Sequence, residues 1–106
     1  MAKIVPFGMS PPKALTIIRE VAQDTSRLYY SAHARKRMRQ RHITPPQIVR
    51  SLRSGRLVEG PAQAIGGNWE CVVEYVSAGQ PIQVVLAIEL VDPASYVTVI
   101  TVKIIG

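Results

Sequence analysis

The segment Ser31–Thr44, with the sequence SAHARKRMRQRHIT, decides how the rest of the chain is organised. Ser31 is a typical N-cap residue and predicts a helix over residues 32–41. Ala34 and Met38 fall four residues apart and give this helix a narrow apolar stripe, while most of its other positions carry positive charge. We therefore expect a basic helix that attaches to the core along one stripe.

The charged positions of this predicted helix form two rows. His33, Arg37 and Arg41 are spaced four residues apart and share one face. Arg35 and Arg39 form a second basic row. Each pair of like charges at this spacing costs an isolated helix about 0.2–0.5 kcal/mol, and the helix dipole favours cations only in the last turn. This repulsion indicates that the charges are retained for an anionic ligand.

The net charge of the 106-residue chain is +6 at pH 7 and is unevenly distributed. Nine of the 13 Lys and Arg residues lie between Arg27 and Arg56, an interval that contains no Asp or Glu. A basic block of this kind is the electrostatic signature of a protein that binds an anionic partner. A solvated basic face without a partner is the alternative that charge alone does not exclude.

Composition excludes several classes of protein. Hydrophobic residues make up 47% and charged residues 19% of the chain, which predicts a globular domain rather than a disordered chain. No apolar run approaches the roughly 18 residues of a membrane-spanning helix, and residues 1–9 do not form a secretory signal. A single cysteine, Cys71, excludes an internal disulfide and a multi-cysteine zinc site. We expect a soluble cytoplasmic protein with no metal, no cofactor and no membrane association.

Outward from the quoted segment towards the N-terminus, the sequence predicts one more helix. Ser10 followed by Pro11 is a typical helix start, and apolar residues at helical spacing predict a helix over residues 11–23. Residues 27–30 predict a short extended segment because they end in two tyrosines. Residues 1–9 are expected to form an arm or an edge strand.

Towards the C-terminus, a third helix is predicted directly after the quoted segment. Thr44-Pro45-Pro46-Gln47 is a capping box with Pro at the first helical position. Ile48, Val49 and Leu52 give this helix a buried side. Gly55 stands where a left-handed residue commonly ends a helix, so we expect the helix to end there.

After Gly55 the apolar pattern changes from helical spacing to alternation, which is typical of strands. The predicted strands cover residues 57–58, 68–77, 82–89 and 96–105, with turns at 60–61, 78–81 and 92–95. Helices followed by an antiparallel meander indicate an α+β fold. We expect N-terminal helices packed on a four-stranded antiparallel sheet.

The last predicted strand contains an irregularity. Simple alternation places Thr101 and Lys103 on the same face as Val97 and Val99, where they interrupt an apolar row. Polar residues at such positions indicate a cleft, which the basic helix would border if it crosses that face. The alternative is that Lys103 marks the end of the sheet at solvent.

The row of His33, Arg37 and Arg41 has the chemistry of a metal-free ribonuclease. A neutral imidazole can accept the proton of an RNA 2′-hydroxyl, and guanidinium groups can stabilise the charge that develops on the phosphate. The alternatives are a partly buried structural histidine, and arginines that pair with Glu70 or Glu74 on the sheet.

The quoted segment resembles the pattern S-x-H-A-x-x-R-M-x-x-R-x-I-[ST] of the bacterial family called domain of unknown function 4258, and the resemblance covers about residues 28–102. It implies a barnase, EndoU, colicin and RelE-like fold of two helices followed by a four-stranded antiparallel sheet. It also implies a RelE-type toxin opposed by an acidic antitoxin. The matching residues are His33, Arg37, Arg41 and, more weakly, Thr101. His42 departs from the family, which commonly has Gly there, at a position expected to close the helix in a left-handed conformation.

Taken together, the sequence predicts a single RelE-like domain over residues 1–106. Residues 1–26 form an N-terminal arm and extra helix, and residues 27–106 form the family core. We expect an endoribonuclease toxin that acts on RNA, with ribosome-bound mRNA as one candidate substrate. The predicted catalytic residues are His33, Arg37, Arg41 and Thr101, and the predicted nucleic-acid-binding residues are Arg35, Lys36, Arg39 and Lys103.

Two other functions stay open at this point. The two helices joined by His42-Ile43-Thr44 resemble a DNA-binding helix-turn-helix, although Pro45-Pro46 leave few useful groups at the start of the candidate recognition helix. The same basic face could also serve a non-catalytic RNA-binding domain. Neither the oligomeric state, for which a dimer is one option, nor the role of the N-terminal helix follows from the sequence.

Overall fold

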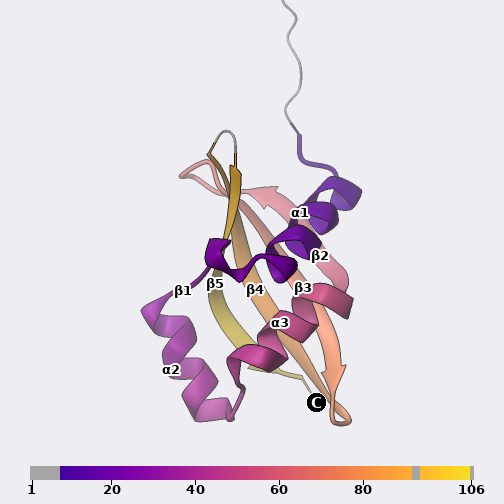
Figure 1. The fold of residues 1–106 in the computed structure, drawn as a ribbon, viewed down its shortest axis with the longest axis vertical. Coiled ribbons are helices and arrows are strands. Elements are labelled where there is room, and N and C mark those ends of the chain that lie inside the picture. Colours follow the sequence, from indigo (N-terminus) through magenta and orange to yellow (C-terminus); the bar gives the residue numbers. More distant parts are fainter. Residues whose placement is uncertain (1–7, 92–93, 106) are drawn as a thin grey trace, which may run out of the picture.

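A computed structural model describes residues 8–91 and 94–105 of the chain. The elements within these residues follow one another as α1 (Pro11–Gln23), the short 3-10 helix η1 (Thr25–Arg27), β1 (Leu28–Tyr30), α2 (Ala32–Arg41), α3 (Pro45–Ser54), β2 (Arg56–Gln63), β3 (Trp69–Ser77), β4 (Gln80–Val91) and β5 (Ala94–Ile104). The α+β prediction is therefore confirmed (Figure 1).

The prediction of a four-stranded antiparallel sheet is wrong, because the described residues form a five-stranded mixed sheet. The strand order is β1-β5-β4-β3-β2, and the pairs from β2 to β5 are antiparallel. The added strand β1 runs parallel to β5, with Leu28 opposite Val97. Residues 27–30 were predicted to be extended, but side-chain alternation over three residues carries no information about which edge they join or in which direction.

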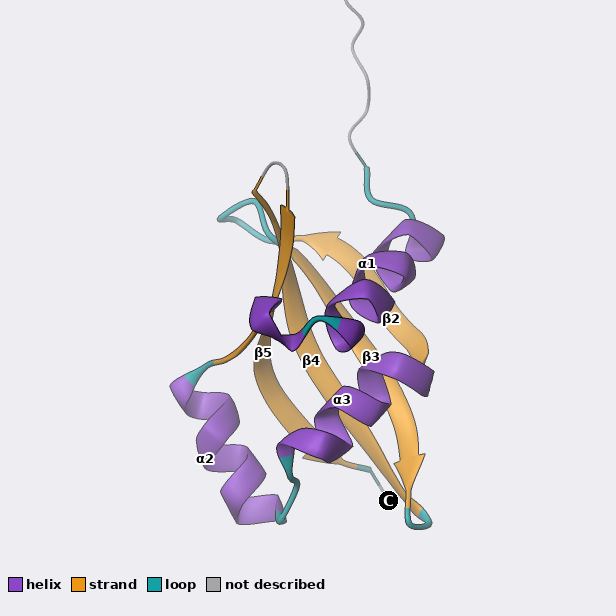
Figure 2. Ribbon diagram, viewed as in Figure 1, coloured by secondary structure: helices purple, strands orange, loops and turns teal. Residues whose placement is uncertain are grey.

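The helices form two groups around the sheet. Helices α1 and α3 lie over one face, whereas α2 lies beside β5, beyond the end of β1 (Figures 1 and 2). The core lies between that face and the helices, and its fully buried members include Ile18, Ile48, Leu52, Val84 and Leu86. No helix in the described part of the chain has the length and apolar character needed to cross a membrane.

A bulge in β5 overturns the predicted faces of the last strand. The register between β4 and β5 shifts by one residue at Ile100. Val99 and Val102 therefore both lie on the buried face, although they are three residues apart. Thr101 and Lys103 lie on the opposite face, which α1 and α3 do not cover. The prediction that they share a face with Val99 is wrong, since simple alternation does not hold across a bulge.

The start of α2 is fastened to this bulge by Ser31. The Ser31 hydroxyl accepts a hydrogen bond from the Ala34 N–H at 2.9 Å, as expected of an N-cap, and donates to the Ile100 carbonyl at 2.9 Å. The Ser31 N–H donates to the Val99 carbonyl at 3.0 Å. The chain thus passes from β1 directly into α2 while still bonded to β5.

The end of α2 has the left-handed residue that the sequence predicts. His42 has φ 57° and ψ 40°. Its N–H donates to the Arg39 carbonyl at 3.3 Å, and the Ile43 N–H donates to the Met38 carbonyl at 2.9 Å. These two bonds form a Schellman motif, and the buried side chains of Ile43 and Met38 supply its usual apolar contact.

The predicted start of α3 is confirmed, whereas the conformation predicted for the residue that ends it is wrong. The capping box is present, with the Thr44 N–H donating to Gln47 Oε1 at 2.8 Å. Gly55, however, has φ −74° and is not left-handed. A Cβ atom there would lie 2.6 Å from the Ser51 carbonyl oxygen and 2.7 Å from that of Glu74. Glycine is needed because α3 ends in close contact with β3, which no local pattern reveals.

The remaining boundaries follow the predictions with small changes. Helix α1 spans the predicted residues, and the Ser10 hydroxyl caps it by accepting from the Lys13 N–H at 3.2 Å. Strand β2 continues through Gly60 and Pro61, where the sequence predicted that it ends, because bulges accommodate them within its pairing with β3. Residues 1–7 and part of the predicted turn at 92–95 lie outside the described residues.

Candidate nucleic-acid interface

The two basic rows of α2 lie on opposite sides of its buried stripe. Ala34 is fully buried and Met38 is 6% exposed, so this stripe faces the core. With 3.6 residues per turn, His33 and Arg37 fall on one side of the stripe, and Arg35 and Arg39 fall on the other. We call these two sides the His33 row, which includes Arg41, and the Arg35 row. The helix therefore carries positive charge on both sides of its buried stripe.

The cations of α2 are free of acidic partners within the described residues. His33, Arg35, Arg39 and Arg41 are exposed, as is Lys36. Arg37 is half-buried, and its Nη1 donates to Gln40 Oε1 at 3.1 Å. This arrangement keeps five positive charges of one helix uncompensated at the surface.

The ion pairs formed among residues 8–91 and 94–105 lie elsewhere. They join Arg27 to Asp24 at 3.2 Å and Arg56 to Glu74 at 3.5 Å. The hydrogen bond from Gln83 and the charge of Arg56 lower the pKa of the Glu74 carboxyl group. The alternative interpretation, in which α2 arginines pair with acids of the sheet, is therefore not found in the described part of the chain.

A cleft lies between α2, α3 and the end of β1. One part, of about 750 Å³, has walls that include Arg35 and Arg39 and a floor that includes Met38 and Ile43. The adjoining part, of about 510 Å³, is lined by residues that include Val49, Arg50 and Arg53. Both parts share Tyr30 and Pro45, so we describe them as one feature, the Tyr30 cleft.

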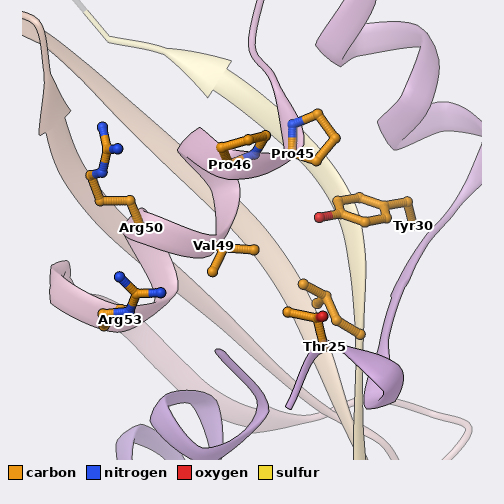
Figure 3. Close-up of a pocket in the computed structure, with 8 residues that line it drawn as sticks. Thr25, Tyr30, Pro45, Pro46, Val49, Arg50 and Arg53 are labelled. Atoms are coloured by element: carbon orange, nitrogen blue, oxygen red, sulfur yellow. The ribbon is translucent and has the colours of Figure 1, made fainter. Parts of the chain in front are cut away.

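Tyr30 stands at the centre of this cleft. Figure 3 shows its ring reaching across the space towards α3, with the hydroxyl group directed towards the side chains of that helix. The ring is half-buried. Burial raises the pKa of the Tyr30 hydroxyl, and the positive charge of Arg35 opposes part of that rise. The phenol is therefore protonated near neutral pH and can donate a hydrogen bond.

The positive potential of the cleft comes from side chains rather than from the start of α3. The first two residues of α3, Pro45 and Pro46, have no backbone N–H. The next N–H, that of Gln47, already donates to the Thr44 hydroxyl at 3.4 Å. An anion in the cleft must therefore be held by arginine side chains.

The structure does not bring all the predicted site residues together. The His33 row lies on the side of α2 away from the Tyr30 cleft. Lys103, on the uncovered face of the sheet, lines a separate pocket of about 340 Å³ with Glu59 and Glu70. Thr101 follows Ile100, which binds the residue that starts α2, so Thr101 and His33 belong to the same junction of β5 and α2. Lys103 is the predicted nucleic-acid-binding residue least favoured by this arrangement.

Cys71 does not belong to the site. It is 1% exposed in the core, and burial raises the pKa of its thiol to about 11. The thiol is therefore protonated near neutral pH, and a protonated buried thiol is not an effective nucleophile. Among the described residues, no three His, Cys, Asp or Glu side chains gather closely enough to hold a metal ion.

Sequence reasoning missed three residues of the cleft: Tyr30, Arg50 and Arg53. The two arginines belong to the basic block, but their spacing of three residues on the predicted third helix was the only sign that they share a side. Tyr30 was treated as part of an extended segment. Its place in the cleft depends on the parallel pairing of β1 with β5, which the sequence did not predict.

Comparison with known families addresses the predicted resemblance. Residues 30–103 match the family described as Domain of unknown function (DUF4258). The chain belongs to this family. The matched region is more than half of the chain and contains α2, α3 and the Tyr30 residue of the cleft, whereas α1 precedes it. No match was found among curated proteins or among solved structures. The four arginines of the Tyr30 cleft therefore all lie within the matched residues.

Proposed function

We propose that this DUF4258 protein binds RNA through α2 and cleaves it without a metal ion. One observation carries the proposal: the five Lys and Arg side chains of α2 have no acidic partner among the described residues, although their mutual repulsion disfavours the helix. Arginine binds phosphate through planar paired donors and stays charged at any working pH. A chain of phosphates is a ligand that suits several such groups on one helix.

The His33 row supplies the chemistry in this proposal. His33 takes the proton of a 2′-hydroxyl, whose oxygen then forms a bond to the adjacent phosphorus. In this proposal Arg37 and Arg41 stabilise the extra negative charge on the phosphate, and the Thr101 hydroxyl donates a hydrogen bond to a phosphate oxygen. The bond from phosphorus to the 5′-oxygen breaks, and that oxygen takes a proton from water. The products are a 2′,3′-cyclic phosphate and a 5′-hydroxyl end.

Sequence-specific DNA recognition is less well supported. A recognition helix uses the side chains of its first turn to contact base edges. In α3 this turn begins with two prolines, and the capping box occupies Thr44 and Gln47. The helix is also followed by β2 rather than by a third helix. These features favour contact with a flexible single strand over insertion into a duplex groove.

The sequence signature extends the proposal. It matches the DUF4258 pattern, and the RelE-type activity implied by that resemblance supports a role as a toxin that acts on RNA in the cytoplasm and is opposed by an acidic antitoxin. The exposed positive charge of α2 is compatible with such a partner, because an acidic protein covering α2 would also block access to RNA. Expression of the chain with and without its neighbouring reading frame would test this extension separately.

The direct test is a cleavage assay with the full chain in a chelating buffer. The substrate is a labelled single-stranded RNA, and the same sequence made of DNA serves as a control that lacks the nucleophile. We expect cleavage of the RNA alone, and a loss of about 10²–10⁴-fold in rate for His33→Ala with unchanged RNA affinity. Lys13→Ala removes an exposed cation from the first turn of α1, and the start of that helix lies away from α2 (Figure 1), so this variant should cleave like wild type.

Three results would change the conclusion. RNA binding without cleavage would show a non-catalytic RNA-binding domain. Equal cleavage by wild type and His33→Ala would remove the histidine from the mechanism. Failure of the wild-type protein to bind RNA at low salt would overturn the whole proposal.

A further inference from the structure

The Tyr30 cleft and the His33 row lie on opposite sides of α2, so a site for cleavage on one side leaves the cleft unexplained. We propose that the Tyr30 cleft is a nucleotide-binding subsite that holds one base of a single-stranded RNA against Tyr30. Arginines of α2 and α3 bind the phosphates on either side of that base. The bound strand then crosses α2 and reaches the His33 row. This inference rests on the proposed RNA-binding function and adds a positioning site to it.

The cleft has the size and the charge for such a ligand. Its two adjoining parts of about 750 and 510 Å³ fall within the range of small-molecule sites. The described lining contains Arg35, Arg39, Arg50 and Arg53 and no Asp or Glu. The arginines come from two helices, so they stand on two walls and can bind two successive phosphates.

The floor between these walls is apolar and suits a base. Met38, Ile43 and Val49 contribute to it, and a flat aromatic base can pack on such a surface. Tyr30 adds the aromatic ring on which bases of single-stranded RNA commonly stack. Its hydroxyl makes no hydrogen bond within the described residues, so it is free to bind the polar edge of a base (Figure 3).

The order of arginine, apolar and aromatic side chains across the cleft favours RNA over an acidic peptide as the ligand. Each nucleotide joins a flat apolar ring to a phosphate, and the cleft places an aromatic ring and apolar floor between two pairs of arginines. An acidic peptide would match the charges but gives no reason for a tyrosine at the centre. The peptide is therefore the competing ligand that the experiment must include.

The test follows backbone amide signals of the full chain by NMR during titration with a short single-stranded RNA. The RNA carries 2′-fluoro groups so that it cannot be cleaved. We expect shifts at residues 30, 43 and 49 together with shifts along α2. Tyr30→Leu should weaken RNA binding by about ten-fold or more, from the loss of stacking. Because Tyr30 packs against the core and its replacement can perturb folding, the exposed pair Arg50→Ala and Arg53→Ala provides a second variant, with Lys13→Ala as the matched control.

The outcomes separate this inference from the proposed function. RNA that shifts only the His33 row, with unchanged affinity in the cleft variants, would overturn the subsite while RNA binding stands. An oligoglutamate peptide that shifts the cleft signals when RNA does not would assign the cleft to a protein partner and also overturn it. If the wild-type protein binds no RNA, the proposed function and the subsite fail together.

Discussion

Ser31 shows how a single hydroxyl group joins the basic helix to the sheet. It accepts from the Ala34 N–H and donates to the Ile100 carbonyl, both at 2.9 Å. Ser31→Ala should lower the free energy of unfolding by about 1–3 kcal/mol, because it removes the cap and leaves the Ile100 carbonyl without this donor. Urea denaturation would measure the loss. Ser31→Thr keeps both bonds and should stay close to wild type, whereas equal midpoints for Ser31→Ala and wild type would contradict this role.

His42 ends α2 through its left-handed backbone conformation. A left-handed conformation costs a residue with a Cβ roughly 1–2 kcal/mol, and glycine avoids that cost while losing more entropy on folding. His42→Gly should therefore raise the free energy of unfolding by about 0.5–1 kcal/mol. Thermal denaturation followed by circular dichroism provides the measurement, and a lower midpoint for the glycine variant would show that the imidazole has a stabilising contact.

At this scale, local chemistry was a reliable guide wherever the relevant partners were near in sequence. The Ser31 and Thr44 caps and the left-handed His42 all depend on bonds spanning a few residues, and each was predicted. Gly55 was misread because its constraint comes from the Glu74 carbonyl, a residue distant in sequence. The second bond of Ser31, to Ile100, was missed for the same reason.

At the scale of elements, the contact between α3 and β3 depends on Gly55. Gly55→Ala would place a methyl group within about 3 Å of two carbonyl oxygens, so the end of α3 must move away from β3. We expect a loss of about 1–3 kcal/mol in the free energy of unfolding, as for other overpacked sites. Chemical denaturation would test this, with Gly66→Ala as a control at an open loop position. A Gly55→Ala variant as stable as that control would contradict the close approach.

The elements themselves followed from the sequence better than their arrangement did. Helical spacing and caps predicted the three α-helices found among the described residues, as well as the two rows of α2. The parallel pairing of β1 with β5 and the bulge at Ile100 were not predicted. Both depend on how strands that are distant in sequence pair with each other, and no local pattern specifies that pairing. As a result the sequence indicated which side chains share a face of α2, but not which face borders α3 and the Tyr30 cleft.

At the scale of the whole molecule, the charge distribution carries the functional argument. The acid-free block seen in the sequence folds into two neighbouring helices, and its arginines line both sides of α2. A ligand that crosses α2 would contact both. Affinity for RNA should therefore fall as salt is added. In a plot of log affinity against log salt concentration, the expected slope is about −0.7 for each phosphate contact on a single strand.

The most direct measurement is the salt dependence of RNA affinity for the wild-type chain and for a variant with Arg35, Arg39 and Arg41 changed to Ala. All three side chains are exposed, and alanine favours helix, so the fold should be retained. We predict a log–log slope that is shallower by about 2 for the variant, from three lost phosphate contacts, and an unchanged slope for Lys13→Ala. Equal slopes for wild type and the triple variant would contradict the claim that α2 holds RNA by its phosphates.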